Sequence, residues 1–166
     1  MAKRGDERKA RVEAEAHLVS SYIAFAYPDD YSMQRVRLGP IEPQLPIEEL
    51  TESEFAMVGS FRRWADAIVI QANQLVLIEG AIRPSTGDPA TILLYSRRIK
   101  STPELLKWRD LPVRMELVIA IEDPEVSQIA YELGVNVIRY TTPETDAYIA
   151  TIMPRFQRPT RWQPTA

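Results

Sequence analysis

With 166 residues and a formal charge of −3, the chain can fold as one domain with its own core, and the charge argues against indiscriminate electrostatic binding to nucleic acid. It has no cysteine, which excludes disulfides, zinc–thiolate sites and cysteine catalysis, and its single histidine, His17, excludes a multi-histidine metal site. No apolar stretch approaches the roughly 20 residues of a membrane span, so we expect a soluble protein with no membrane partner.

The N-terminal part is predicted to hold two helices separated by a strand and a proline-rich connector. The segment from Asp6 to Phe25 is rich in Ala, Glu, Arg and Lys, and its apolar residues recur at helical spacing. Gln34 to Leu38 alternates as a short strand does, and the connector GPIEPQLP follows it. Thr51 and Glu54 have the spacing of a capping box, which predicts a helix from Thr51 to Arg62.

The segment WADAIVIQANQLVLIEGA, from Trp64 to Ala81, predicts a β-hairpin. Its two arms are rich in Ile, Val and Leu, and the polar residues QANQ separate them. A two-residue and a four-residue turn give the same pairing, in which Asp66 lies opposite Glu79 with Cβ atoms roughly 5 Å apart. Two like charges at this separation destabilise a sheet unless a cation neutralises them, so the pair is a candidate metal site.

The rest of the chain is predicted to alternate helices and strands before an extended tail. The expected elements are a loop from Pro84 to Pro89, a helix from Ala90 to Lys100, a short helix from Thr102 through Trp108, a strand from Val113 to Ile121, a helix from Asp123 to Gly134, a strand from Val135 to Tyr140 and a weak helical stretch from Thr145 to Ile152. Strand, helix and strand in this close order imply a parallel crossover.

The tail PRFQRPTRWQPTA is too rich in Pro and Arg to build a core. Trp162 has no core to join within this segment, and aromatic and Arg side chains are enriched at interfaces, so docking on a partner is a plausible interpretation. We therefore divide the chain into an N-terminal segment (1–60), a core (61–142) and a C-terminal extension (143–166), together a single domain with tails.

The order of these elements resembles the PD-(D/E)XK nuclease superfamily, which has the restriction-endonuclease-like fold, over roughly Phe61 to Tyr140. The resemblance implies an α/β fold, a mixed central β-sheet flanked by helices. It also implies that Asp66 and Glu79 correspond to the residues that bind Mg²⁺. Tyr95 matches the tyrosine of a Gln-x-x-x-Tyr pattern that some branches carry, whereas Thr91 stands in place of its Gln.

Ala81 departs from the family, because it occupies the position at which the Glu-x-Lys motif has its lysine. A methyl group cannot hold a water or stabilise the charge that develops on a phosphate during cleavage. Arg83 is a candidate replacement, but arginine stays protonated and is a poor proton acceptor. Trp64 is expected opposite Ala81, where its ring would fill the space of the missing lysine.

Each candidate also has a structural interpretation that stays open. Asp66 can lie in solvent at a strand edge, and Glu79 can pair with an arginine. Glu15 can be an extra acidic ligand or a surface residue, and Tyr95 can simply pack. The remaining candidates for contact with DNA or a protein partner can equally be solvent-exposed surface residues. They are Arg97, Arg98, Lys100, Arg155, Arg158, Arg161 and Trp162.

The sequence therefore predicts a catalytically impaired nuclease-fold protein with a structural role in an assembly. Head-completion, adaptor and neck proteins of tailed phages are similar in kind, which implies protein partners, a homo-oligomeric ring or connector, and a place in the cytoplasm during assembly or in the virion. In this interpretation no cofactor is expected. The alternatives are an active nuclease that requires Mg²⁺ and uses a relocated cation, and a DNA-binding module without catalysis.

Overall fold

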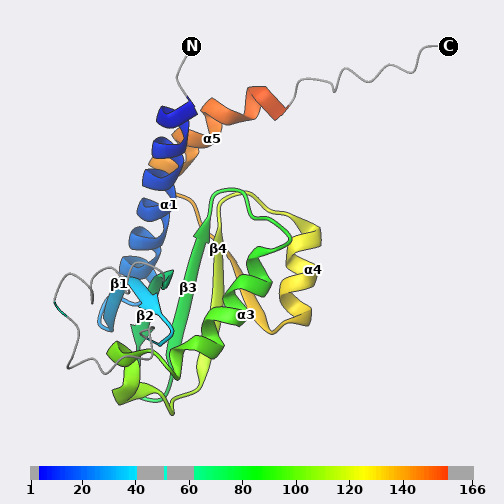
Figure 1. Ribbon diagram of the computed structural model, residues 1–166. Coiled ribbons are helices and arrows are strands. Elements are labelled where there is room, and N and C mark those ends of the chain that lie inside the picture. Colours follow the sequence, from blue (N-terminus) through cyan, green and yellow to red (C-terminus); the bar gives the residue numbers. More distant parts are fainter. Residues whose placement is uncertain (1–3, 41–50, 52–61, 157–166) are drawn as a thin grey trace.

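The computed structural model describes residues 4–40, 51 and 62–156 and has an α/β fold, with a five-stranded mixed sheet flanked by helices (Figure 1). In chain order the elements are α1 (Arg4–Ala26), β1 (Tyr31–Leu38), β2 (Arg63–Ile70), β3 (Leu75–Ala81), α3 (Asp88–Ile99), the 3₁₀ helix η2 (Pro103–Trp108), β4 (Val113–Ile119), α4 (Pro124–Glu132), β5 (Val135–Arg139) and α5 (Pro143–Phe156). Apart from its two end residues, the predicted helix Thr51–Arg62 lies outside the described residues.

The strands follow one another across the sheet in the order β1-β2-β3-β4-β5. The first three are antiparallel neighbours, and β3, β4 and β5 are parallel, which confirms a parallel connection through α4. The predicted hairpin register is also confirmed, since Ile70 pairs with Leu75 and Ala67 with Ile78. The same register sets Asp66 across from Glu79, one step beyond the last of these pairs.

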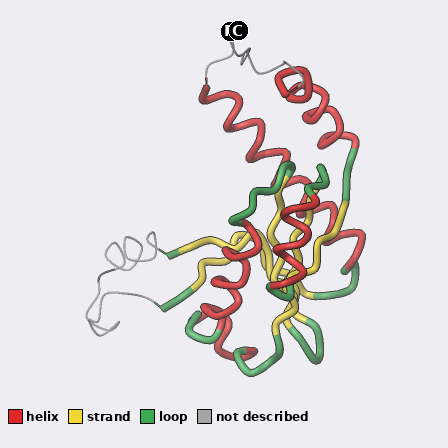
Figure 2. Tube along the Cα trace, turned by 90° about the vertical axis from the view of Figure 1, so that its right-hand side faces the viewer, coloured by secondary structure: helices red, strands yellow, loops and turns green. Residues whose placement is uncertain are grey.

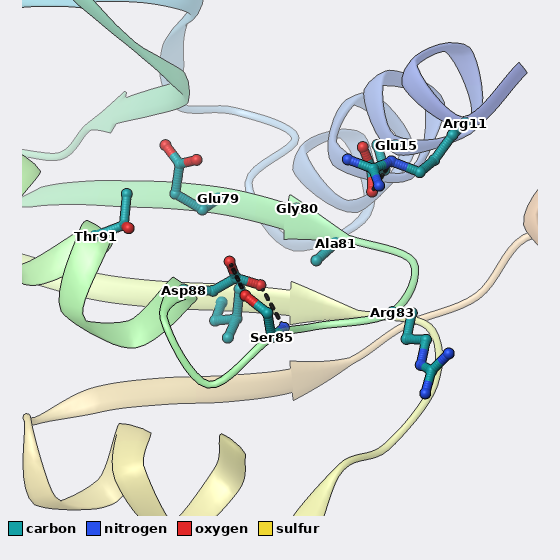
Figure 3. A pocket seen from close by; sticks show the side chains of 10 residues that line it. Arg11, Glu15, Glu79, Gly80, Ala81, Arg83, Ser85, Asp88 and Thr91 are labelled. Carbon is teal, nitrogen blue, oxygen red and sulfur yellow. Dashed lines mark hydrogen bonds and ion pairs between the residues drawn. The ribbon is translucent and has the colours of Figure 1, made fainter. Parts of the chain in front are cut away.

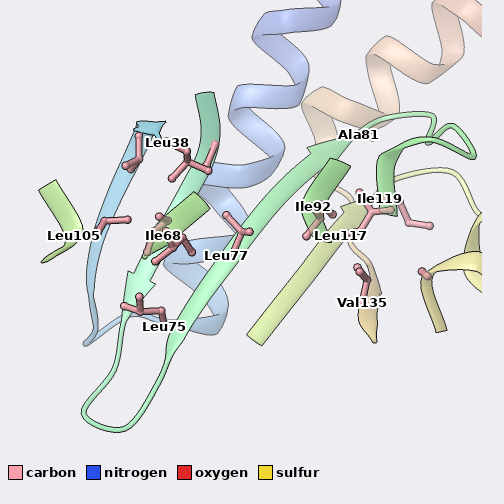
Figure 4. Packing of buried hydrophobic residues seen from close by; sticks show 14 of the residues in the cluster. Leu38, Ile68, Leu75, Leu77, Ala81, Ile92, Leu105, Leu117, Ile119 and Val135 are labelled. Carbon is pink, nitrogen blue, oxygen red and sulfur yellow. The ribbon is translucent and has the colours of Figure 1, made fainter. Parts of the chain in front are cut away.

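Helices cover both faces of the sheet. One hydrophobic cluster joins α3, η2 and α4 to one face, where Ile92 and Leu105 are fully buried (Figure 4). A second cluster joins α1 and α5 to the other face, with Leu18 fully buried and Ile149 packed against it. Because β3 lies between the two layers, its residues Leu75–Ile78 are all buried, and this explains its continuous apolar run.

Helix α1 and helix α5 lie side by side and extend beyond the end of the sheet (Figures 1 and 2). The segment 5–13 of α1 is exposed along its whole length. Thus α1 and β1, which belong to the predicted segment 1–60, form part of the sheet and its cover, and α5 from the predicted extension packs against α1. Among the described residues, no helix combines the length and the apolar character needed to cross a bilayer.

The side-chain alternation of β2 shifts at Asp66. Ile68 packs in the cluster under α3, whereas Ala67 packs in the cluster under α1, as alternation requires. Ala65 should therefore lie on the α1 side, yet it packs in the same cluster as Ile68. The strand thus changes face between Ala65 and Ala67.

The neighbouring strand has its own irregularity at the same level. Arg35 of β1 adopts a φ of 53°, in the left-handed region that non-glycine residues rarely occupy. The pairs Gln34–Ala67 and Val36–Ala65 flank it, but Arg35 and Asp66 are not paired with each other. The two strands therefore share a kink, and it lies where the candidate carboxylates begin.

Candidate carboxylate site

The structure brings Asp66 and Glu79 together through reciprocal hydrogen bonds. The backbone N–H of Asp66 donates to Glu79 Oε1 at 3.1 Å, and the backbone N–H of Gly80 donates to Asp66 Oδ2 at 2.9 Å. Each carboxylate therefore satisfies one backbone group where β2 and β3 cease to pair. The second oxygen of each carboxylate has no hydrogen-bond partner within the described part of the chain.

The two carboxylates disfavour each other's ionised form. Burial raises the pKa of Glu79 to about 9, and the negative charge of Asp66 adds to this shift. Burial also raises the pKa of Asp66, although the Gly80 N–H and the charge of Arg35 oppose that effect. Among the described residues, no cationic side chain acts to lower the pKa of Glu79. The pair is thus partly desolvated and lacks a neutralising partner on the Glu79 side.

Glycine at position 80 allows α1 to approach this pair closely. A Cβ atom at Gly80 would lie 2.4 Å from Val19 Cγ2, a separation that real Cβ atoms do not show. The close approach brings Glu15, on the preceding turn of α1, to the end of β3. There, burial raises the pKa of Glu15, and the negative charge of Asp66 contributes in the same direction. Of the two interpretations of Glu15, the structure favours proximity to the pair.

A cavity of about 220 Å³ opens at the end of β3 (Figure 3). It is lined by Arg11, Glu15, Glu79, Gly80, Ala81, Arg83, Ser85, Asp88, Thr91 and Leu117. Asp88 faces it from the first turn of α3 and is held by the N–H and hydroxyl groups of Ser85, at 2.7 and 2.8 Å. Acidic side chains from α1, β3 and α3 therefore converge on one hollow.

The position of the family's lysine carries a buried methyl group, since Ala81 is 8% exposed and packs in the core cluster under α3. The candidate replacement Arg83 lines the same cavity, but its side chain is directed away from Glu79 in Figure 3. Arg11 lies beside Glu15, with 3.5 Å between Arg11 Nε and Glu15 Oε1. No lysine or arginine in the described ranges forms a salt bridge with Asp66 or Glu79.

The side chains fit a metal ion only in part. No group of three or more His, Asp or Glu side chains within residues 4–40 and 62–156 is arranged to hold a metal. Mg²⁺, however, keeps several waters and can bind through one or two carboxylates. Asp66 and Glu79 are suited to hold such a hydrated ion, which would supply charge neutralisation there.

Of the other predicted site residues, Tyr95 lies near enough to feel the charges of the pair, and the rest lie near the end of α3 or outside the described residues. Tyr95 is half-buried against the core cluster under α3, which supports its packing role, and burial together with the charge of Glu79 raises its pKa. Arg97 and Lys100 are exposed near the end of α3, and the Arg98 side chain lies against Gly39. The side chain of Arg155 and the residues Arg158, Arg161 and Trp162 are not among those described.

The prediction for Trp64 is wrong. Paired residues of β2 and β3 end at Ala67 and Ile78, so the register does not carry Trp64 to Ala81. The Trp64 ring lies instead against two arginines of β1, Arg35 and Arg37. The kink at Asp66 accounts for the difference, because it changes the face that the residues before Asp66 on β2 occupy.

Sequence reasoning missed Arg11, Asp88 and the strained Arg35. Arg11 lies one helical turn before Glu15, and Asp88 begins the helix that follows β3. The sequence therefore contained a signal for both residues. Arg35 gives no such signal, because arginine is not a residue type that favours positive φ.

Comparisons with known proteins add no functional identification. No protein-family model and no curated protein matches the sequence. A solved structure described as a protein of unknown function, AF1548, superposes with a TM-score of 0.44 and 8% sequence identity, covering 90% of this chain and 73% of that one. A similarity of this size identifies no shared function.

Proposed function

We propose that this chain is a nuclease-fold protein that has lost turnover and serves as a structural component of a larger assembly. The observation that carries the proposal is the end of β3, where Asp66 and Glu79 meet but the lysine position is a buried alanine. Hydrolysis of a phosphodiester needs stabilisation of the charge that develops on the phosphate and activation of a water. Ala81 supplies neither charge stabilisation nor water activation, and no nearby cation in the described chain supplies both.

The hydrogen bonds of the pair support a structural role for its carboxylates. One oxygen of each binds the backbone where the β2–β3 ladder ends. An acidic side chain in this role satisfies buried N–H groups that would otherwise cost stability. Asp66 and Glu79 can therefore persist in the chain without serving catalysis.

The surface supports the assembly part of the proposal. Several large apolar side chains are exposed, and aromatic and Met side chains are enriched at the core of protein interfaces. They are Val12, Phe25, Tyr31, Trp64, Leu94, Leu106, Tyr131 and Met153. Val12 lies on α1 and Met153 on α5, the two helices that pack side by side. A head-completion, adaptor or neck protein of a tailed phage is the specific role we propose, in the cytoplasm during assembly or in the virion.

Native mass measurement and sedimentation across a concentration series test the assembly role. We expect a homo-oligomer that Val12→Asp dissociates, because a buried charge opposes association. The matched variant Tyr131→Asp introduces the same charge on α4, on the opposite face of the sheet from α1, and should leave the oligomer intact because the proposed contact is on α1. A monomer at every concentration, with no binding to phage connector components, would contradict this role.

An active Mg²⁺-dependent nuclease is the second candidate, and one observation favours it. Glu15, Glu79 and Asp88 face one cavity together with Arg11 and Arg83, so both acidic ligands and cations are within it. In this case Asp66 and Glu79 would hold a hydrated Mg²⁺, and an arginine would stabilise the phosphate without accepting a proton.

Plasmid DNA incubated with the protein and Mg²⁺ or Mn²⁺ separates the two candidates. We expect no cleavage above that of the variant Asp66→Asn. Cleavage by the wild-type chain that both Asp66→Asn and Glu79→Gln abolish would establish the nuclease. Arg83→Ala and Arg11→Ala would then show which cation replaced the lysine.

A further inference from the structure

A tryptophan of β2 and two arginines of β1 form a surface at one edge of the sheet. Trp64 is 41% exposed, although tryptophan is a costly side chain to leave in water. The Arg37 and Arg35 guanidinium carbons lie 4.6 and 5.4 Å from the centre of its ring. We call these three residues the Trp64 surface.

The arginines of this surface are not held in salt bridges. Arg35 and Arg37 form none with any described acid, although their charges act on Asp66 and Glu104. The nearby Arg62 behaves differently, because it is buried and donates two hydrogen bonds to the carboxylate of Glu104, at 2.7 and 2.6 Å. Arg62 is thus a structural arginine, whereas the guanidinium groups of Arg35 and Arg37 remain available to a ligand.

The backbone conformation of Arg35 also needs explanation. Its φ of 53° is unfavourable for a side chain with a Cβ, and glycine or asparagine would adopt it at lower cost. Strained residues persist where the surrounding structure holds them, and they concentrate at binding sites. Here the strain places a guanidinium against the Trp64 ring.

A cavity of about 270 Å³ lies next to this surface, between α1 and the kinked strands. Trp64 and Arg35 line it on the strand side, and its apolar wall includes Val12 and Val19 of α1. Glu15 and Asp66 also line it, so an anionic group is repelled from them while an uncharged planar ring is not. The hollow and the arginines therefore suit different parts of one ligand.

We propose that the Trp64 surface binds single-stranded nucleic acid, with a base stacked on Trp64 or in the adjacent cavity and phosphates on the arginines. Stacking on an aromatic side chain requires a base that is outside a duplex, whereas the arginines contact any phosphate backbone. A guanidinium that stacks on a ring still has N–H groups for phosphate oxygens. This proposal goes beyond an assembly role and requires no cleavage, so it stands or falls separately from both candidate functions.

Fluorescence anisotropy of a labelled oligothymidylate, measured without divalent cations, tests the proposal. We expect Trp64→Ala to weaken binding about ten-fold or more and Trp64→Phe to retain most of it. Arg37→Ala should weaken binding and lower the slope of log affinity against log salt by about 0.7, the value for one lost phosphate contact on a single strand. The full chain is used throughout.

Two variants guard against general effects of charge and of folding. Arg139→Ala removes an exposed arginine from β5, the opposite edge of the sheet, and should change the affinity by less than about two-fold. Arg35→Gly removes the guanidinium and suits the positive φ, so it should weaken binding without lowering the thermal midpoint.

Three results would overturn the proposal. The first is binding by Trp64→Ala as tight as that of the wild-type chain. The second is an equal loss in Arg139→Ala and Arg37→Ala, which would indicate non-specific attraction to the whole protein. The third is affinity for a duplex of the same length equal to that for the single strand, or no binding to either.

Discussion

Glu116 on β4 and Glu79 on β3 are two acids within the same sheet, and their surroundings differ. Glu116 is fully buried, and it accepts hydrogen bonds from the hydroxyls of Tyr22 at 2.9 Å and Tyr27 at 2.8 Å. Arg114 Nη2 lies 2.9 Å from Glu116 Oε1. Glu79 accepts one backbone N–H and faces Asp66, a second acid.

The difference shows two ways in which a sheet can contain a carboxylate. Around Glu116 the cost of burying the carboxylate is offset by three donors. Tyr27 is affected in turn, because its burial and its hydrogen bond to Glu116 raise the pKa of its hydroxyl to about 12. Around Asp66 and Glu79 the cost is offset only in part, by two backbone N–H groups and the charge of Arg35, and the negative charge of Asp66 adds to the cost of ionising Glu79. The hydrogen bonds of Glu116 hold α1 to the sheet, whereas the Asp66–Glu79 pair could bind a cation.

The largest expected effect is that of Glu116→Ala, which tests whether Glu116 is a structural acid. Its removal leaves two tyrosine hydroxyls without an acceptor, so we expect the free energy of unfolding to fall by about 3 kcal/mol. Urea denaturation measures the change. Glu122→Ala is the matched control, since Glu122 is exposed and 3.6 Å from Arg139, and it should cost less than about 0.5 kcal/mol. An equal loss of stability in Glu116→Ala and Glu122→Ala would contradict a structural role for Glu116.

Gly80→Ala tests whether close packing of α1 brings Glu15 to the pair. The new methyl group would meet Val19, and we expect a loss of about 2 kcal/mol in the free energy of unfolding. Val19→Ala makes room for that methyl group, so the double variant should cost less than the sum of the two single variants. Additive losses in denaturation experiments would contradict this packing.

Glu79→Gln has the smallest expected effect at pH 5, and its effect grows as pH rises. Because the folded-state pKa of Glu79 lies above the ordinary value of 4.5, the wild-type chain should lose stability as pH rises from there toward about 9. The neutral glutamine avoids this loss. Each pH unit in this window costs the wild-type chain about 1.4 kcal/mol, so we expect a gain of several kcal/mol at pH 8 and almost none at pH 5. A destabilised variant at pH 8 would mean that the ionised Glu79 has a favourable partner.

Much of this contrast can be read from the sequence, and the rest depends on contacts between distant segments. Alternation along Trp64–Ala81 predicts the hairpin and its register, and therefore the meeting of Asp66 and Glu79. Glu116 and Arg114 are both visible as charged residues in an apolar strand, but the partners Tyr22 and Tyr27 are far away in the chain. Neither the kink nor the new position of Trp64 follows from residue type, because packing between strands decides them.

Direct titration of Glu79 by carbon-13 NMR of its side-chain carboxyl group tests the central claim, that the pair is kept without the cation that catalysis requires. The account predicts a pKa far above 4.5, at about 9, in the protein without divalent metal. A pKa at or below 4.5 would contradict it, since this value would mean that a positively charged side chain neutralises the pair and that the catalytic cation has moved rather than disappeared.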